Sequence, residues 1–458
     1  MLTLDDRYRQ FCDATAEVFA AIPELEPLRF FVFRELFVNG RGAGITDVVK
    51  HWLRLARRFG KPPFRSYSAA DVLLWMESRR DVLVEPILAI QARLQAIGVK
   101  SVVASFNAPE QPTFPVIRFA AKPASAVPTW AKEGWDGLES FLAAKNKTQL
   151  RRAFAIKARA VAGLFSAVEQ LLDRVRPAVV VNASNNLVAS ATLVIAARRR
   201  GITSLLLQHG MPQVFYTPLL NDVMLTWGAR STAALVRLGV APEKLRVTGS
   251  PRHDAFLSVD GNAARQALLR AHGLPHRLTL VFFSNGNDPQ RNGIGPVTAA
   301  EWLERAAELV PDVNVVARLH PNEDGRVFAS SRKVVIMKRE VGVMTALAGA
   351  DIVASQCSTA LDEAVLFGKP VWQFQGDGWP ELASNWRDGL AARVGSAGEL
   401  VSHLQAALAG APAGRCDAGL ADSVFANHGR AAEVAAAAIA QLIERRVCES
   451  AMASERLP

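Results

Sequence analysis

Cysteine is scarce in this sequence, and its placement excludes two classes of site. The 458 residues include only four cysteines, which are Cys12, Cys357, Cys416 and Cys448. They form no CxxC pair and no Cys/His spacing suited to a metal ion, so neither a disulfide framework nor a metal centre is predicted. No apolar run reaches the ~18 residues that a transmembrane helix requires. The first ten residues are polar, which is atypical of a secretory signal. We therefore expect a cytoplasmic protein.

Negative charge is also in deficit. Lys and Arg number 53 against 43 Asp and Glu, which gives a formal charge of +10. An excess of positive charge favours anionic partners such as phosphates, nucleotides, acidic glycans or an anionic membrane surface. The basic residues are mostly scattered and no strong nucleic-acid-binding motif is present, so we expect no nucleic-acid partner.

Residues 1–68 show apolar and basic residues at helical spacing and predict a helical N-terminal extension. In the segment 48–58, for example, apolar side chains alternate with Lys50, Arg54, Arg57 and Arg58. One interpretation is a cap on the first domain with a solvated basic face. The other is peripheral contact with an anionic membrane, at the inner face of the cell membrane, or with a lipid-linked acceptor.

The chain is longer than one ordinary core supports, so we expect two domains of about 200 residues. Short buried strands alternate with helices through both halves, a pattern typical of doubly wound α/β domains with parallel sheets. Gly249-Ser250-Pro251 indicates the boundary. We predict one Rossmann-like domain over residues 69–250, a second over 251–420, and a C-terminal helix and tail over 421–458.

A buried strand ends abruptly at polar residues in the first domain. The apolar run Ser204–Leu207 is followed by Gln208, His209 and Gly210. In open α/β sheets, ligands bind beyond the carboxyl ends of the strands, so Gln208 and His209 are predicted to border a binding crevice. Gly210 is expected to let the chain turn there. The alternative for His209 is an imidazole that only holds the loop.

The second domain has three polar segments at comparable positions. Ser284, Asn285 and Gly286 follow its first strand, and small residues there let backbone N–H groups approach a phosphate. Arg318, His320 and Pro321 follow the strand 313–317, where the Arg and His side chains are suited to donate to a phosphate. The alternatives are an ordinary glycine-rich loop and a loop histidine fixed by proline. The third segment lies further along the chain.

The third segment, 354–364, clusters hydroxyl groups at a strand end and a helix start. Ser355, Ser358 and Thr359 stand there, and Glu363 follows one turn into the helix. Free N–H groups at a helix start suit a phosphate. The alternative is a simple N-cap, worth ~1 kcal/mol. Glu363 is either a capping partner or an acceptor for ribose hydroxyls.

In this order and spacing, the motifs resemble those of the GT-B superfamily of nucleotide-sugar glycosyltransferases. The chain looks similar to bacterial surface-polysaccharide enzymes, including CDP-glycerol transferases and capsule Kdo- and sialic-acid-type transferases. The resemblance rests on Leu207–Gly210, Val247–Phe256, Arg318–Pro321 and Ser355–Val371, and it covers roughly residues 175–445. The CDP-glycerol enzymes have Trp before the histidine and Tyr-Ser-Ser in the second domain. Gln208 and Cys357-Ser358-Thr359 stand there instead, which disfavours that subfamily.

The resemblance implies two domains that face each other across a cleft, with His209 as the catalytic base for an acceptor hydroxyl. It implies that His320, Ser358, Thr359 and Glu363 bind the nucleotide-sugar donor, CMP- or UDP-linked. The acceptor would be a surface glycan, a lipid-linked sugar or a protein. Because a base faces the leaving group and no Asp-x-Asp motif stands out in a suitable place, transfer is predicted to be inverting and metal-independent, with no cofactor.

Two other functions remain open. The non-hydrolysing UDP-N-acetylglucosamine 2-epimerases share the architecture, a His-Pro-Asn stretch (His320-Pro321-Asn322) and the segment from Glu363 to Val371. Their N-terminal Gly-Thr-Arg-Pro-Glu signature has no counterpart here. The other alternative is a non-catalytic subunit that binds a nucleotide sugar within a glycan-assembly complex.

Overall fold

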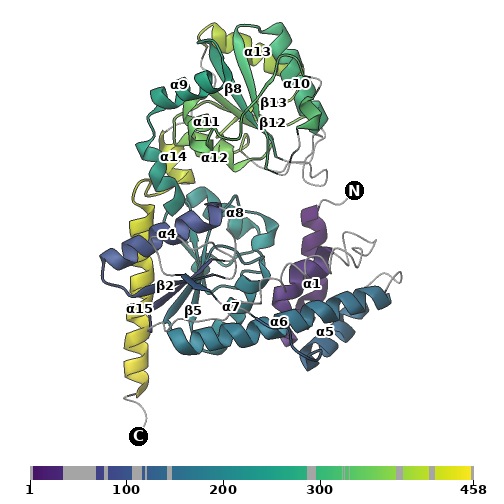
Figure 1. The fold of residues 1–458 in the computed structure, drawn as a ribbon, viewed down its shortest axis with the longest axis vertical. Coiled ribbons are helices and arrows are strands. Elements are labelled where there is room, and N and C mark those ends of the chain that lie inside the picture. The colour runs from purple at the N-terminus through teal and green to yellow at the C-terminus, as the bar shows by residue number, and fades with distance from the viewer. Residues whose placement is uncertain are drawn as a thin grey trace. The chain divides into compact units, whose positions relative to one another are not determined.

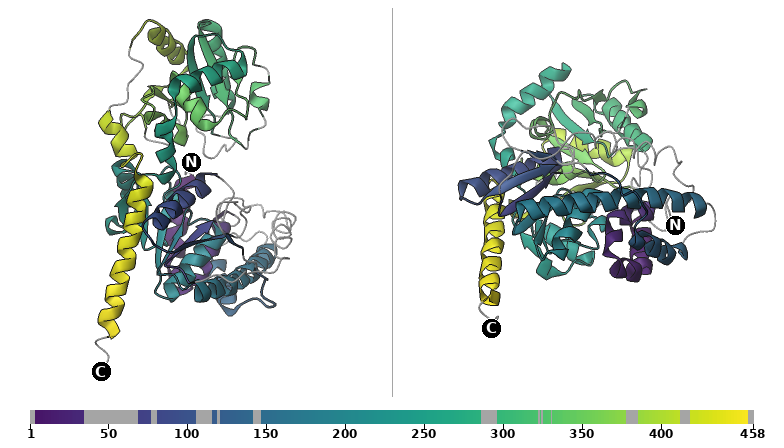
Figure 2. Two further views of the ribbon diagram at one scale, coloured as in Figure 1. Left: turned by 60° about the vertical axis from the view of Figure 1, so that its left-hand side comes forward. Right: turned by 60° about the horizontal axis from the view of Figure 1, so that its bottom comes forward.

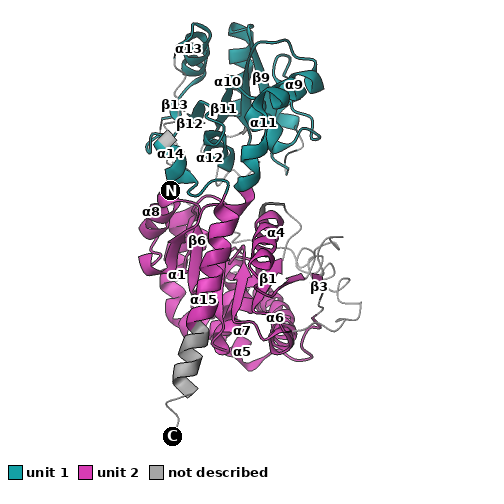
Figure 3. Cartoon of the chain, turned by 90° about the vertical axis from the view of Figure 1, so that its left-hand side faces the viewer, with its two compact units in different colours: residues 1, 3, 253–429 teal, residues 2, 4–252, 430–458 magenta. Residues whose placement is uncertain are grey.

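The computed structural model describes most of the chain in two compact units (Figure 3). The N-terminal unit comprises Leu4–Arg252 together with Arg430–Pro458, and the C-terminal unit comprises His253–Gly429. The described residues are 4–34, 69–76, 81–105, 116–118, 121–141, 147–285, 296–321, 323, 325–329, 331–377, 385–411 and 418–454. Gly286 and the basic segment around residues 50–65 lie outside these ranges.

The N-terminal unit is built on a seven-stranded parallel sheet with the order β3-β2-β1-β4-β5-β6-β7. Its strands are β1 (Val72–Met76), β2 (Ser101–Ser105), β3 (Val116–Arg118), β4 (Val179–Asn182), β5 (Thr203–Leu207), β6 (Val223–Thr226) and β7 (Leu245–Val247). β1 and β4 are buried along their whole length, because every side chain on both faces is covered by helices. The strand order reverses between β1 and β4, and such a switch point opens a crevice at the carboxyl ends.

Helices cover both faces of this sheet (Figures 1 and 2). One face packs against α1 (Leu4–Ala21), η1 (Pro23–Leu28), α2 (Arg29–Val32), α5 (Thr129–Glu139), α6 (Lys147–Val175) and α7 (Val188–Arg199). The other face packs against α4 (Asp81–Ala96) and α15 (Ala431–Ser454). Phe11 and Phe19 of α1 are almost fully buried, so the first helix is part of the N-terminal core. α8 (Ala229–Arg237) lies between β6 and β7 along the chain.

The C-terminal unit repeats this plan with a six-stranded parallel sheet in the order β10-β9-β8-β11-β12-β13. Its strands are β8 (Leu278–Phe283), β9 (Val313–Arg318), β10 (Val335–Ile336), β11 (Ile352–Ser355), β12 (Val371–Phe374) and β13 (Ala392–Val394). Its α-helices are α9 (Gly261–His272), α10 (Pro296–Leu309), α11 (Val343–Gly349), α12 (Thr359–Val365), α13 (Ala397–Leu408) and α14 (Ala418–Val424). The order reverses between β8 and β11.

The predicted α/β class with two doubly wound parallel sheets is confirmed. The strands that sequence patterns missed are β3 and β13, each three residues long and at the edge of its sheet. Three residues are too few to show a periodicity, and an edge strand need not be apolar on both faces. None of the helices in the described ranges is both long and apolar enough to cross a membrane.

Candidate functional site

The switch point of the C-terminal unit joins two of the predicted segments. Ser355, at the end of β11, donates to the carbonyl oxygen of Phe283 at 2.6 Å, and its Oγ lies 3.0 Å from Asn285 Oδ1. Asn285 Nδ2 in turn donates to the Sγ of Cys357 at 2.9 Å. The ends of β8 and β11, which are neighbours in the sheet, are therefore linked by two side chains that are 70 residues apart in the sequence.

Ser358 lies next to Ser355, at the position directly before α12. Its Oγ accepts from the backbone N–H of Ala360 at 3.2 Å, and its own N–H points to Ser355 Oγ at 3.3 Å. Ser358 is thus an N-cap, and Thr359 is the first residue of α12. A hydroxyl that accepts from the backbone still has its hydrogen to donate. The half-buried hydroxyls of Ser358 and Thr359 can therefore donate to a bound anion.

The loop after β9 is organised by a carboxylate that sequence reasoning missed. Glu323 is only 6% exposed. It accepts from Ser284 Oγ at 2.6 Å and from the backbone N–H of His320 at 2.8 Å. Ser284 therefore donates its hydroxyl hydrogen to Glu323, and its backbone N–H donates to the Arg318 carbonyl oxygen at 2.9 Å. Phosphate binding by this loop stays a prediction. Glu323 stands only three residues after His320 in the sequence. That spacing does not distinguish a buried carboxylate from a solvated one in a loop, so sequence reasoning could not assign its role.

Arg318 also has an internal partner. Its Nη1 donates to the carbonyl oxygen of Val341 at 2.6 Å and lies 3.3 Å from Met337 Sδ. Partial burial lowers the pKa of the Arg318 guanidinium from its ordinary value. This nitrogen holds the segment before α11 in place, so Arg318 is a weaker candidate for phosphate binding than its position at a strand end indicated.

Glu363 is paired with a histidine inside the C-terminal unit. His253 Nε2 lies 3.1 Å from Glu363 Oε1, and the two side chains are 0% and 3% exposed. The imidazole of His253 packs against Phe256 and Phe425, with ring centroids 4.8 and 4.4 Å away. His428 Nε2 lies 3.1 Å from the backbone carbonyl oxygen of His253. His253 was not among the predicted site residues, because its partner stands 110 residues later.

In the loop after β5, in the N-terminal unit, the side chain of Gln208 is hydrogen-bonded to other residues of the protein. Gln208 Nε2 donates to the Gly210 carbonyl oxygen at 2.9 Å and to Ser231 Oγ at 3.0 Å. Its Oε1 accepts from the backbone N–H of Trp227 at 2.9 Å. Both of its amide hydrogens are used and the side chain is buried, so Gln208 holds the β5 and β6 loops together. The bond to Ser231 could not be predicted, because Ser231 stands 23 residues later in the chain.

His209 is half-buried beside a buried tyrosine. Its Nδ1 lies 3.3 Å from Tyr216 Oη, and its backbone N–H lies 3.4 Å from the same oxygen. Burial raises the pKa of Tyr216 to about 12, so the phenol stays protonated at neutral pH. The phenol of Tyr216 therefore fixes the Nδ1 side of the imidazole.

Gly210 does not need to be glycine for the backbone conformation seen. Its φ lies outside the left-handed region, and a Cβ placed there would meet open space. The expectation that glycine is needed for the turn is therefore wrong. Within the described ranges, no group of three or more His, Cys, Asp or Glu side chains is arranged to hold a metal ion.

Together, the two switch-point sheets define a GT-B-like fold of two Rossmann-like units. No protein-family model matches the chain, and no curated protein matches its sequence. Solved structures do match. The UDP-GlcNAc 2-epimerase of Neisseria meningitidis, bound to UDP-GlcNAc, has a TM-score of 0.53 at 14% identity, covering 81% of this chain and 99% of its own. The UDP-GlcNAc 2-epimerase of Methanocaldococcus jannaschii has a TM-score of 0.53 at 13% identity, covering 81% and 99%.

A putative UDP-N-acetylglucosamine 2-epimerase from Listeria monocytogenes gives the same TM-score of 0.53 at 14% identity, covering 82% of this chain and 98% of its own. The prediction of a surface-polysaccharide glycosyltransferase is contradicted by these neighbours, which favour the 2-epimerase alternative. The reason is that the motifs used lie mostly in the C-terminal unit. Both groups of enzymes share its His-Pro and Gly-Lys-Pro-Val segments, so those segments do not specify the reaction.

Proposed function

We propose that this chain binds a uridine diphosphate sugar through its C-terminal unit and is an enzyme of the non-hydrolysing UDP-N-acetylglucosamine 2-epimerase kind. The observation that carries the proposal is the Ser355–Ser358 arrangement at the switch point between β8 and β11. Ser355 donates its hydrogen to Phe283 and fixes the loop, and Ser358 keeps its hydroxyl hydrogen at the place where α/β sheets bind ligands. Structures that share the fold have been solved with UDP-GlcNAc bound, which supports the choice of ligand.

In this proposal the hydroxyls of Ser358 and Thr359 donate to the diphosphate. His320 and Pro321 form the second side of the phosphate site, fixed by the bond from the His320 N–H to Glu323. Glu363, held by His253, accepts from the ribose hydroxyls. Hydrogen bonds of hydroxyls to an ionised group contribute about 1.5–3 kcal/mol each, so two or three suffice for measurable binding.

Inversion at carbon 2 breaks the C2–H bond, and because no carbonyl adjoins that carbon, the electron pair forms a C1–C2 double bond while the C1–O bond to UDP breaks. A proton then adds to the opposite face of carbon 2 as UDP rejoins carbon 1. An acid–base group must therefore reach the sugar. We propose His209 for this task, because an ordinary histidine, with a pKa of ~6.5, suits both directions of transfer and Tyr216 holds the ring of His209. The substrate and the product are both UDP-sugars, so the net reaction consumes no acceptor and releases no nucleotide.

The test is incubation of the full chain with UDP-N-acetylglucosamine in D₂O, followed by proton NMR. We expect a second anomeric signal from the carbon-2 epimer and deuterium at carbon 2 of both sugars, without accumulation of free UDP. His209→Ala should lose the exchange and keep UDP binding. Unchanged substrate with no deuterium would rule out the epimerase reaction, and stoichiometric release of UDP would rule out its non-hydrolysing character.

Binding is measured separately from turnover by thermal unfolding with UDP. A ligand specific for the native state stabilises it by RT ln(1 + [L]/Kd), or ~2.7 kcal/mol at a hundredfold excess over Kd. A non-catalytic nucleotide-sugar-binding subunit is the second candidate. That candidate predicts stabilisation by UDP with no deuterium exchange.

A further inference from the structure

The ladder of hydrogen bonds between β5 and β6 changes its pattern beside His209. The two strands pair in regular parallel register as far as Leu207 and Leu225, and the Gln208 N–H then donates to the Leu225 carbonyl oxygen at 3.0 Å. In a regular parallel ladder, the next bond would run from the backbone N–H of Trp227 to the carbonyl oxygen of Gln208. In this structure that carbonyl oxygen has a different donor.

Gln208 and Trp227 exchange main-chain and side-chain partners at this point. The Trp227 backbone N–H donates to Gln208 Oε1 at 2.9 Å, and the indole Nε1–H donates to the Gln208 carbonyl oxygen at 2.9 Å. Gln208 and Trp227 are only 3% and 2% exposed. Because a buried carbonyl oxygen without a donor is unfavourable, the indole N–H fixes the direction of this carbonyl group. A phenylalanine ring has no such donor.

The peptide group between Gln208 and His209 is therefore held at both of its polar atoms. Its carbonyl oxygen accepts from the Trp227 indole, and its N–H lies 3.4 Å from Tyr216 Oη. Because the peptide group is planar, holding it restricts the directions in which the Cα–Cβ bond of His209 leaves the backbone. Tyr216 Oη also lies 3.3 Å from His209 Nδ1. Trp227 and Tyr216 thus hold the imidazole from the two ends of one peptide group.

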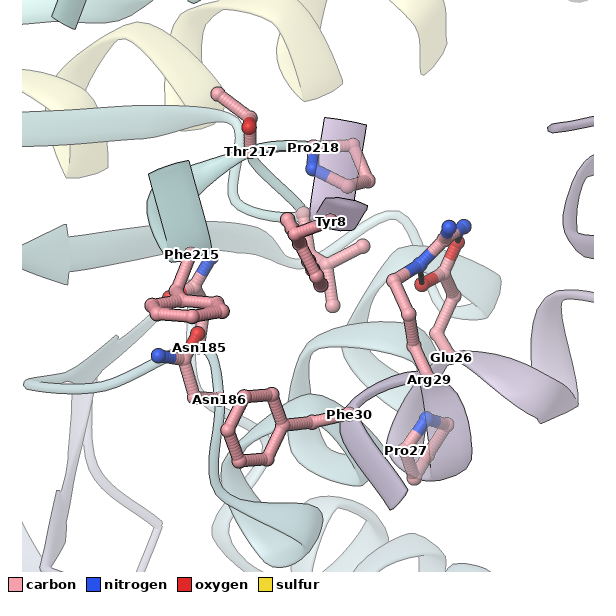
Figure 4. Close-up of a pocket in the computed structure, with 11 residues that line it drawn as sticks. Tyr8, Glu26, Pro27, Arg29, Phe30, Asn185, Asn186, Phe215, Thr217 and Pro218 are labelled. Carbon is pink, nitrogen blue, oxygen red and sulfur yellow. Dashed lines mark hydrogen bonds and ion pairs between the residues drawn. The ribbon is translucent and has the colours of Figure 1, made fainter. Parts of the chain in front are cut away.

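Tyr216 is itself anchored by the loop after β4 and by the N-terminal helices. Asn185 Nδ2 donates to the Tyr216 carbonyl oxygen at 3.3 Å. The preceding residue, Phe215, contacts Tyr8 of α1 and Phe30 of α2 edge to face, with ring centroids 4.9 and 5.3 Å apart (Figure 4). The N-terminal helices, for which the sequence offered no family counterpart, therefore support the loop on one side of His209. Trp227 supplies the support on the other side.

We propose that Trp227 is a positioning residue for His209, acting through the Gln208 carbonyl group. The inference rests on the proposed function, in which His209 exchanges a proton with carbon 2 of the sugar. Such a transfer requires the two atoms to lie within hydrogen-bond reach, and a displacement of ~1 Å can lower the rate by about a hundredfold. The indole N–H of Trp227 therefore contributes to the rate of the reaction, whereas the proposed nucleotide contacts lie in the other unit and do not depend on it.

The test compares Trp227→Phe with Trp135→Phe in the full chain. Trp135 is a matched control, because it is 2% exposed in the same unit and its Nε1 has no hydrogen-bond partner among the described residues. Deuterium incorporation from D₂O into UDP-N-acetylglucosamine gives kcat and KM. NMR of the labelled histidine rings, assigned with His209→Ala, reports on the imidazole itself.

Trp227→Phe should lower kcat by about tenfold or more, because the imidazole is no longer held in place. KM and the Kd of UDP should stay within about twofold, since ground-state binding does not use this contact. The ring signals of His209 should shift. Trp135→Phe, which removes an indole N–H without a described partner, should change none of these quantities.

Tyr216→Phe releases the other end of the peptide group and should also lower kcat, so the test stands if Trp227→Phe does not fold. Equal kcat in the wild type and Trp227→Phe overturns the inference, and so does an equal loss in Trp135→Phe. A wild type that incorporates no deuterium refutes the proposed function, while His209 signals shifted by Trp227→Phe alone would retain the positioning contact. Incorporation with unchanged signals and kcat in Trp227→Phe would do the opposite.

Discussion

The corners after β5 and after β11 look alike in sequence and differ in what their polar atoms do. Each follows a buried parallel strand and consists of small or polar residues. After β11, Ser355 links two strand ends and Ser358 keeps a hydrogen to donate. After β5, Gln208 has both amide hydrogens and its oxygen bonded within the protein. A strand-end position therefore indicates where a ligand can lie, and only the hydrogen-bond inventory shows which groups are available to it.

The largest expected effect concerns the buried pair behind the C-terminal corner. His253→Leu leaves the Glu363 carboxyl buried without its imidazole partner. We expect the apparent free energy of unfolding from urea titration to fall by about 3–5 kcal/mol. His253→Gln can still donate to Glu363 and should lose roughly half as much. If both variants lose the same small amount of stability, the His253–Glu363 pair does not stabilise this part of the fold, and other contacts must position Glu363.

The second prediction addresses the β5 corner. Gln208→Leu removes the partners of the Trp227 N–H, the Gly210 carbonyl and Ser231 Oγ together. Each buried group left unsatisfied costs about 1–3 kcal/mol, so we expect a loss of roughly 3 kcal/mol by urea titration. UDP affinity should not change in the variant that remains folded. If the variant is stable but binds UDP more weakly, Gln208 contacts the ligand, and the loop after β5 then resembles the loop after β11 in offering polar groups to it.

The third prediction uses the pKa of Tyr216, raised to about 12 by burial. The unfolded chain ionises tyrosine near pH 10, so the folded state is favoured fully below pH 10 and loses this contribution as the pH rises through 12. We expect about 2 kcal/mol of stability to disappear over that range. The measurement is the difference in unfolding free energy between wild type and Tyr216→Phe from pH 8 to pH 12. A constant difference would show that Tyr216 does not titrate there.

The fourth prediction separates capping from ligand binding at Ser358. Ser358→Ala removes the N-cap of α12, which should lower stability by ~1 kcal/mol. It also removes a donor to the diphosphate, so the Kd for UDP should rise by roughly tenfold, measured by calorimetry. Ser358→Thr keeps a hydroxyl at this position and should retain both the N-cap and the donor to the diphosphate. Loss of stability with unchanged UDP affinity would leave Ser358 as a cap alone.

The smallest expected effect is at Gly210. Because its φ is ordinary and a Cβ would meet open space, Gly210→Ala should change the free energy of unfolding by less than about 0.5 kcal/mol. Thermal unfolding is sufficient to check this. A larger loss would indicate that the loop after β5 visits a conformation that only glycine adopts.

The strands that form the centres of both sheets could be predicted from sequence, because burial on both faces requires continuous apolar runs such as 179–181 and 278–283. Edge strands β3 and β13 could not, since they are short and only partly covered. The positions of Ser355, Ser358 and Asn285 at a strand end or a helix start could be predicted because such ends are marked locally, and their role in binding a phosphate stays a prediction. His253 and Glu323 were not, because their roles depend on contacts with distant or unpatterned residues. The reaction was misassigned since the His-Pro and Gly-Lys-Pro-Val segments are common to both groups of enzymes and do not specify it.

The composition of the N-terminal unit has a consequence for how the chain is made. α15 supplies Ala435, Ala436 and Ile439 to the core that also contains Val72 and Leu74 of β1. These residues are synthesised on either side of the whole C-terminal unit, which is therefore an inserted domain. On the ribosome, α4 can cover its part of this face of the first sheet, but the part that α15 covers must remain exposed until the inserted domain has been translated. The C-terminal unit can complete its own core first, so folding order should run against sequence order.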